Sequence, residues 1–140
     1  QAHDYTIQSI EAANRLGNRW LLTTGHINMG AIACELGDLQ IAKRHLSLAY
    51  QLIRNLNATN LLPDLIAGLG SLLDQQEHYT QALDILHFGK QLPGIENETR
   101  IRITGIIGDI SVQLQDKKVE YEPKMYDNNS IDRTIVNLLS

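Results

Sequence analysis

The chain has 140 residues, 43 % of them hydrophobic and 20 % charged, and its net charge at pH 7 is −4. This composition is typical of a soluble globular protein with one core. The negative charge argues against direct contact with nucleic acid or an anionic membrane, because both require a basic surface. The apolar runs are far shorter than the roughly 18 residues of a membrane-spanning helix. A single cysteine excludes an internal disulfide and fits a cytoplasmic location.

Helical patterning begins at once, and residues 1–16 are predicted to form the second helix of a repeat. No signal peptide is recognisable and the first residue is Gln rather than Met, so we expect a piece of a longer protein. The repeat emerges from comparison with a later segment. Three positions of this helix stand 40 residues before similar ones: Ala2 before Ala42, Ser9 before Ala49 and Leu16 before Leu56.

A helix pair is predicted over residues 19–57. Its first helix runs from Arg19 to Leu36, and Gly37 ends it because glycine adopts the left-handed conformation at the lowest cost. Asp38 is then expected to cap the second helix. That helix carries one continuous apolar stripe, with alternating spacings of three and four residues, formed by Leu39, Ala42, Leu46, Ala49, Ile53 and Leu56.

A second pair is predicted over residues 62–92, with Pro63 in the favoured first turn. It repeats the first pair at a distance of 40 residues: Gly30, Ala42, Leu46 and Ala49 return as Gly70, Ala82, Leu86 and Gly89. The small residues predict close helix crossings. We expect Gly30 and Gly70 to leave room that Ala42 and Ala82 fill from the second helices. The next repeat is expected to approach at Ala49 and Gly89. A fixed period of this size predicts a solenoid.

The C-terminal third is predicted to close the array. A capping helix at residues 97–115 covers the exposed edge of the last pair, as solenoids require. Its apolar face consists of Ile103, Ile106, Ile107, Ile110 and Leu114. A polar connector at residues 116–129 leads to an amphipathic helix at residues 130–140. The apolar stripe of that helix, Ile131, Ile135, Leu138 and Leu139, either docks on the domain or contacts another subunit or domain.

The repeated positions resemble the tetratricopeptide repeat (TPR). Met29-Gly30, the turn Gly37-Asp38-Leu39, and the marks Ala42, Leu46 and Ala49 occupy the places of that motif. Leu69-Gly70, Tyr79, Ala82 and Leu86 match it again. The departures are His26 in place of tryptophan, Leu39 in place of an aromatic residue, Glu77 in place of the turn glycine, and a period longer than about 34 residues. The resemblance implies an all-α fold, a right-handed superhelix of antiparallel helix pairs with a C-terminal capping helix.

The segment "EAANRLGNRWLLTTGHINMGAIACELGDLQIAKRHL" is similar to the long-period TPR arrays of large bacterial regulators. These are signal-transduction ATPases that often carry a LuxR-type or AfsR/SARP-type DNA-binding domain. The likeness covers most of residues 1–115. It implies a cytoplasmic module for signal transduction or transcription regulation, whose partner is a protein, a peptide or another domain of the same chain.

No catalytic constellation is recognisable, so we expect no enzymatic activity, no metal and no cofactor. The histidines lack the spacing of helical metal ligands; they are His3, His26, His45, His78 and His87. Cys34 has no CxxC partner and is either structural or a redox sensor. "GLGSLL" at residues 68–73 lies within a helical pattern without a preceding strand, which argues against a phosphate loop.

Binding is therefore the expected function, and the first helices of the repeats are expected to line a concave groove. The groove-facing positions are Thr24, Ile27, Asn28, Ala31, Cys34 and Glu35, then Asp64, Ala67, Gly68, Ser71, Asp74 and Gln75, then Thr104, Ile107, Gly108 and Ser111. The candidate ligand- or peptide-binding residues among them are Asn28, Glu35, Asp64, Ser71, Asp74 and Gln75. The groove lacks the Lys/Arg set that clamps a C-terminal carboxylate. The alternative is a structural spacer or self-association domain without a ligand.

Overall fold

The computed structural model describes residues 2–140, except for the side chains of Ala2, His3, Tyr5 and Leu16. The expected repeat positions Ala2 and Leu16 therefore have side chains outside the described part. The described residues form helices and no strand, so the fold is all-α. The elements are α1 Ala2–Leu16, α2 Arg19–Glu35, α3 Leu39–Leu56, the short 3-10 helix η1 Thr59–Leu61, α4 Leu62–Gln75, α5 Tyr79–Lys90, α6 Asn97–Asp116 and α7 Asn128–Leu139. Over this part of the chain, every helix is too short or too polar to cross a bilayer.

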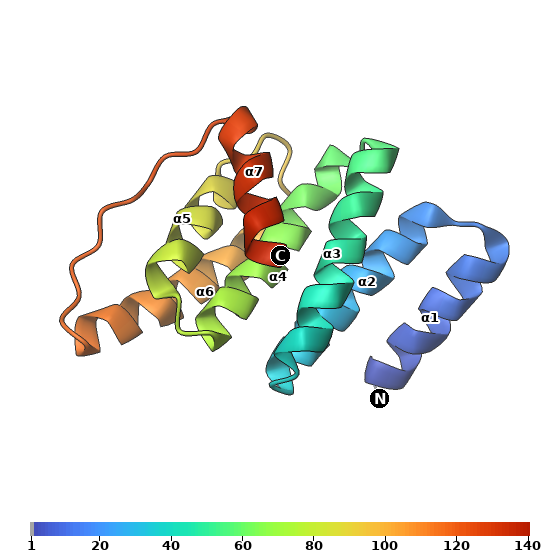
Figure 1. Cartoon of the computed structure of the whole chain (residues 1–140), viewed down its shortest axis with the longest axis horizontal. Helices are drawn as coiled ribbons and strands as arrows, with labels where there is room; N and C mark the ends of the chain where they lie inside the picture. Colours follow the sequence, from blue (N-terminus) through green and yellow to red (C-terminus); the bar gives the residue numbers. More distant parts are fainter. Residues whose placement is uncertain (1) are drawn as a thin grey trace.

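The helices pack mainly against their neighbours in sequence. α2 and α3 form one antiparallel pair and α4 and α5 another, with α1 against α2 and α6 against α4 and α5 (Figure 1). α4 lies at the centre, because it also packs against α2 and α3. This position accounts for its composition: nine of its 14 residues are buried, among them Leu65, Ile66 and Leu69. A helix enclosed by four others has little surface left for polar residues.

The same turn joins the helices of both pairs. Gly37 ends the first helix of one pair with φ +80°, and Glu77 has φ +61° at the equivalent point of the other. In each turn the amide of the left-handed residue donates to a carbonyl three residues back, on Cys34 and Asp74. The turn geometry is therefore kept although only one of the two positions is glycine.

The prediction that Asp38 caps α3 through its side chain is wrong. Asp38 occupies the N-cap position, but its side chain accepts no capping hydrogen bond. Its backbone, at φ −84° and ψ 72°, is turned away from the extended conformation that capping side chains use. Asn18, with ψ 90°, does cap α2, since its side chain accepts a hydrogen bond from the amide of Leu21 at 3.0 Å.

Glycines do leave room at the helix crossings, but leucines rather than alanines fill it. A Cβ on Gly30 would stand 2.8 Å from Cδ2 of Leu46, and one on Gly70 would stand 2.7 Å from Cγ of Leu86. The predicted partners Ala42 and Ala82 are fully buried, and the carbonyl oxygen of Ala42 lies 3.5 Å from the position of a Cβ on Gly30. The leucines fill the space because they reach across the crossing from one turn further along the second helix.

The expectation for Gly89 also needs correction. A Cβ at this position would meet the side chain of Ile66, with Cβ···Cβ at 3.2 Å. Ile66 lies on α4, the partner helix of the same pair, so Gly89 does not open a path for a following repeat. It serves the crossing of α4 and α5, as Gly70 does from the opposite helix.

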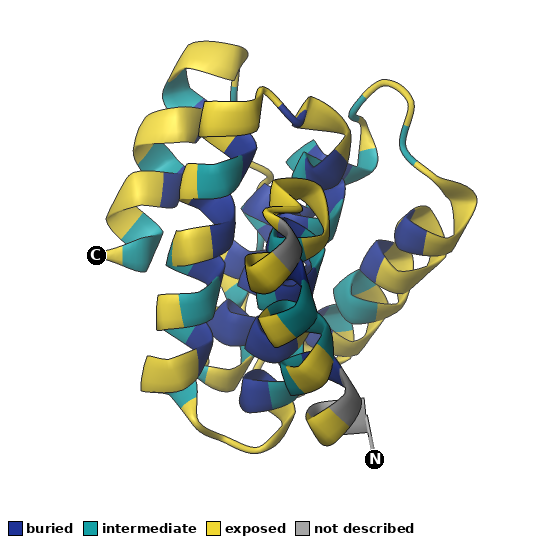
Figure 2. Ribbon diagram, turned by 90° about the vertical axis from the view of Figure 1, so that its right-hand side faces the viewer, coloured by how far each residue is buried: buried dark blue, intermediate teal, exposed yellow. Residues whose placement is uncertain are grey.

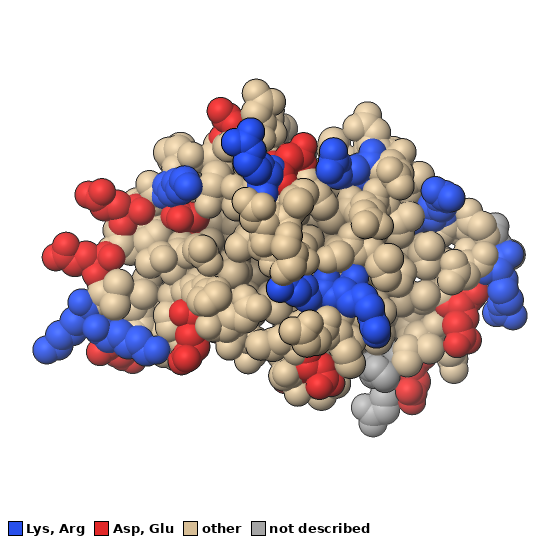
Figure 3. Space-filling model, viewed as in Figure 1, with Lys and Arg blue, Asp and Glu red and all other residues tan. Residues whose placement is uncertain are grey.

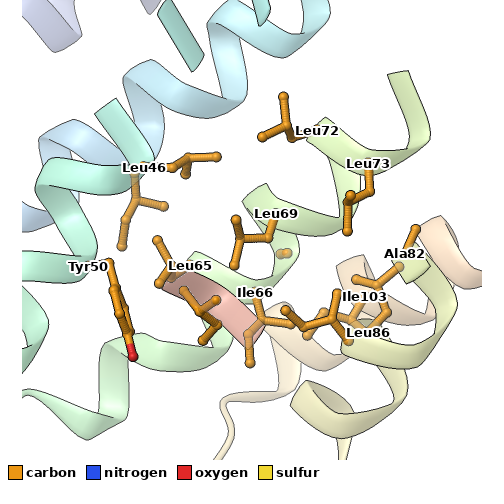
Figure 4. Close-up of a cluster of buried hydrophobic side chains, with 14 of the residues drawn as sticks. Leu46, Tyr50, Leu65, Ile66, Leu69, Leu72, Leu73, Ala82, Leu86 and Ile103 are labelled. Atoms are coloured by element: carbon orange, nitrogen blue, oxygen red, sulfur yellow. The ribbon is translucent and has the colours of Figure 1, made fainter. Parts of the chain in front are cut away.

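One apolar core runs through the helix layers. Leu46 and Tyr50 from α3 approach Leu65 and Leu69 of α4, while Leu86 of α5 lies on the other side (Figure 4). Each helix turns its buried residues inward and its exposed residues outward (Figure 2). α6 completes this core with Ile103, Ile110 and Leu114.

The C-terminal helix docks on the domain. The segment between α6 and α7 passes along α5 (Figure 1), where the Tyr121 hydroxyl donates to Asp84 at 2.7 Å. α7 then packs against α3 and buries Ile131 and Ile135 in the core. The hydroxyl of Tyr50 donates a hydrogen bond to Asp132. The apolar stripe of α7 is thus covered within the same chain.

Candidate functional site

A groove runs across α2, α4 and α6, which lie side by side with α4 between the other two. It has a volume of about 340 Å³ and contains all six residues singled out as binding candidates: Asn28, Glu35, Asp64, Ser71, Asp74 and Gln75. Asn28, Glu35 and Gln75 are exposed, and the other three are half-buried. The structure therefore brings the six together on one open surface.

Equivalent turns of α2 and α4 build the floor of this groove. Asn28 and Gly68 stand 40 residues apart, as do Ala31 and Ser71, and all four line the groove. A Cβ on Gly68 would meet Cδ2 of Leu46 at 2.9 Å, so any larger residue there would have to displace the end of the Leu46 side chain. Ala31, Gly68 and Ser71 are small, so few side-chain atoms occupy this part of the groove, and Asn28 and Ser71 supply its polar groups.

The contribution of α6 differs from the prediction. Arg102, Ile106 and Asp109 line the groove, while Thr104, Ile107, Gly108 and Ser111 do not. Arg102 follows Asp64 by 38 residues, and Asp109 follows Ser71 by the same interval. The 40-residue period therefore does not extend to α6: the interval there is 38 residues, and the intervening helix α5 is also shorter than α3, with 12 residues against 18. The buried residues Ile103 and Ile110, adjacent to Arg102 and Asp109, carry the signal for this register.

At one end the groove continues into a second hollow of about 330 Å³. Here the Thr99 hydroxyl donates a hydrogen bond to Oδ1 of Asp64 at 2.7 Å, and a guanidinium nitrogen of Arg102 lies 3.8 Å from the same oxygen. These contacts hold the Asp64 carboxylate between α4 and α6. Thr24, Glu96 and Glu98 complete the lining. The sequence pattern places Thr24 and Asp64 at the groove, but not Glu96, Glu98, Thr99 or Arg102.

The lining is predominantly acidic. Its carboxylates are Glu35, Asp64, Asp74 and Asp109, with Glu96 and Glu98 at the end, and Arg102 is the one basic residue among those described. Burial, reinforced by the negative charge of Asp109, raises the pKa of Asp74. The face that carries α3 and α7 differs, because basic and acidic side chains are interspersed there (Figure 3). A cation entering the groove would relieve the repulsion between these carboxylates.

Cys34 lies under the groove and is buried. Burial, together with the negative charge of Glu35, raises the pKa of its thiol to about 11. At neutral pH the thiol is therefore protonated, and a protonated thiol is a poor nucleophile and metal ligand. Of the two roles considered for Cys34, this environment favours the structural one.

A histidine pair lies between α2 and α3. Nδ1 of His26 and Nδ1 of His45 are 2.9 Å apart, so one ring donates a hydrogen bond to the other. Burial is the main cause that lowers the pKa of both imidazoles. The charge of a neighbouring basic residue lowers it further, His45 acting on His26 and Arg44 acting on His45. No third ligand joins them: within the described residues no three His, Cys, Asp or Glu side chains come together as a metal set.

Comparison of the chain with family models, with curated proteins and with solved structures finds no match. The arguments about function therefore rest on the residues and geometry of this groove.

Proposed function

We propose that this chain is a TPR-like interaction module of a larger bacterial regulatory protein, and that it binds an extended, basic segment of a partner in the groove of α2, α4 and α6. The observation that carries the proposal is the convergence of Asn28, Glu35, Asp64, Ser71, Asp74 and Gln75 on one groove. The equivalent Gly30–Leu46 and Gly70–Leu86 crossings support a solenoid built on a 40-residue period.

The chemistry of the groove supports a peptide as ligand. The exposed amide of Asn28 can both donate and accept hydrogen bonds, which matches the backbone of an extended chain. The carboxylates of Glu35, Asp74 and Asp109 favour lysine or arginine side chains. The small size of Ala31, Gly68 and Ser71 leaves space for the peptide backbone between them.

The proposal implies a role in relaying a signal. A bound segment would contact α2, α4 and α6 at once, and would favour one relative placement of the helix pairs. In a regulator, this change in the placement of the helix pairs would alter the position or activity of an attached nucleotide-binding or DNA-binding domain. The chain itself supplies recognition and performs no catalysis in this proposal, and its setting is the cytoplasm.

Titration with defined peptides tests this function. The probes are an unstructured peptide with alternating alanine and lysine or arginine, and a counterpart with glutamate in place of the basic residues. Nuclear magnetic resonance should show saturable shifts at the amides of Asn28, Ser71 and Gln75 with the basic peptide and none with the acidic one. Binding should weaken as salt rises, because the contacts are between exposed charges. Equal shifts with both peptides, or shifts scattered outside the groove, would favour the spacer function.

A further inference from the structure

The outward face of α6 is apolar and lacks a partner within the described chain. Ile101 is 62 % exposed and Val112 is 54 % exposed, although both are large and hydrophobic. Between them lie Gly105 and Gly108, where an added Cβ would meet nothing within 4 Å. At about 100° per residue these four positions form a stripe roughly 60° wide, opposite the buried residues Ile103, Ile110 and Leu114.

The two glycines bring no benefit to the chain by itself. A glycine inside a helix is destabilising relative to alanine. Gly30 and Gly70 offset that cost by admitting a leucine from the next helix. Alanine would fit at Gly105 and Gly108 without any clash. The glycines are thus suited to close contact with a helix that this chain does not supply.

The stripe is palindromic. Its members are spaced four, three and four residues apart, so it has the same pattern in both directions. If α6 is paired antiparallel with a second α6 about the midpoint between Gly105 and Gly108, Ile101 comes level with Val112 of the second copy. Gly105 likewise comes level with Gly108. A twofold interface requires this kind of self-complementarity.

One charge pair beside the stripe favours the same arrangement, and another opposes it. Arg102 and Asp109 lie on one flank of α6, and both are exposed. The twofold axis places that flank of both copies on the same side of the seam. Arg102 then lies within about 3 Å, along the helix axis, of the level of Asp109 in the second copy, at 1.5 Å per residue. The contact occurs twice. Glu98 comes level with Gln115 of the second copy, so it lies within about 1.5 Å, along the helix axis, of the level of Asp116, and these two carboxylates repel each other.

We propose that a second copy of this chain binds here, through an antiparallel α6–α6 contact centred between Gly105 and Gly108. Ile101 packs on Val112 of the second copy at each end of the seam, and Arg102 pairs with Asp109 of the second copy. Since these two residues also line the groove, both grooves open on the same side of the dimer. The seam shares Arg102 and Asp109 with the groove, but its apolar and glycine positions lie outside the groove lining, so the contact does not depend on what the groove binds.

Sedimentation velocity over a wide concentration series tests the proposal. The wild-type protein should form a species of twice the 15.7 kDa monomer mass. Ile101→Glu and Val112→Lys should each weaken the dimer by at least about tenfold. An equimolar mixture of the two variants should recover association, because the introduced carboxylate then faces the introduced ammonium group at one end of the seam, while the other end keeps its Ile–Val contact. Glu98→Gln should tighten the dimer.

Controls separate folding from association. Both substitutions lie at exposed positions, so circular dichroism of dilute samples should show unchanged helix content. Gly105→Ala combined with Gly108→Ala should raise the melting temperature of the dilute protein and still weaken the dimer, an opposition that general destabilisation does not produce. The proposal is overturned by a wild-type protein that stays monomeric at the highest concentration. It is equally overturned by a dimer that the two charged variants leave intact, or by a mixture that associates no better than its components.

Discussion

Gly30 of α2 lies directly against Leu46 of α3, so closely that a Cβ on the glycine would stand 2.8 Å from the leucine Cδ2. Gly70 of α4 and Leu86 of α5 stand in the same relationship 40 residues further along. Both leucines are fully buried. One packing solution thus occurs twice in the chain, and it sets the distance between the helices of each pair.

Replacing Gly70 with leucine should destabilise the protein by about 1–3 kcal/mol or more, because the new side chain must displace Leu86 from a filled core. Gly105→Ala is the matched control. It lies on the outward face of α6, and in dilute solution it should stabilise by about 1 kcal/mol through helix propensity alone. Urea denaturation measures both. Equal stability of Gly70→Leu and wild type would contradict the close crossing of α4 and α5.

Glu77 should be less favourable than glycine, because it has φ +61° in a turn where the equivalent residue is Gly37. A left-handed conformation costs an L-residue about 1–2 kcal/mol. Glu77→Gly should therefore raise the free energy of unfolding by about 1 kcal/mol. Its contact with Lys117, at 3.6 Å between two exposed side chains, contributes little.

The inverse substitution checks this account of the turn. Gly37→Ala should lower the free energy of unfolding by about 1 kcal/mol, since the space around Gly37 is open and only the backbone conformation opposes the change. Both variants can be compared in a single series of denaturation curves. If both substitutions move stability in the same direction, the left-handed geometry is not what governs these positions.

The His26–His45 pair should make stability depend on pH. Burial is the main cause that lowers the pKa of both imidazoles below the ordinary 6.5, so the folded state binds fewer protons than the unfolded chain. The folded state therefore has its full stability above about pH 6.5, where both imidazoles are neutral, and it loses stability progressively as the pH falls below that value. The wild-type melting temperature should decline between neutral pH and pH 5 more steeply than that of a variant with His26→Gln and His45→Gln. Parallel curves would show that the pair does not titrate in this way.

Docking of α7 can be tested with two adjacent residues. Ile135 is fully buried, whereas Val136 is 45 % exposed. Ile135→Ala should cost about 2–5 kcal/mol of stability, since it removes buried methyl groups and leaves a cavity. Val136→Ala should cost much less. Guanidinium denaturation gives both values, and similar effects of the two substitutions would mean that α7 does not pack on α3 in solution.

The helical class and the groove positions on α2 and α4 could be predicted because they depend on local signals. The apolar stripe of α3 fixes which side of that helix is buried, and the 40-residue step from Asn28 to Gly68 carries the register of α2 onto α4. The left-handed turn at Gly37 could likewise be predicted, because the glycine itself is the signal for it.

The errors arose where a position depends on how far a neighbouring element reaches. The groove face of α6 is offset from that of α4 by 38 residues and not by 40, so the period of the earlier pair points to Thr104 instead of Arg102. The contact of Gly89 with Ile66 joins the two helices of one pair, and a repeat pattern alone does not show which neighbouring helix a small residue meets. The Tyr50–Asp132 hydrogen bond joins residues 82 positions apart and has no local signal.

The central claim, that the groove recognises a basic extended segment, is tested most directly by the affinity of a groove variant for the basic peptide. Asn28→Ala, Ser71→Ala and Asp74→Asn combined should leave the melting temperature nearly unchanged, because none of these side chains is buried. Affinity measured by fluorescence anisotropy should fall by at least about tenfold. The control combines Asn55→Ala, Ser47→Ala and Asp38→Asn, which lie outside the groove, and it should bind as wild type does. Equal affinity of the groove variant and this control would contradict the account.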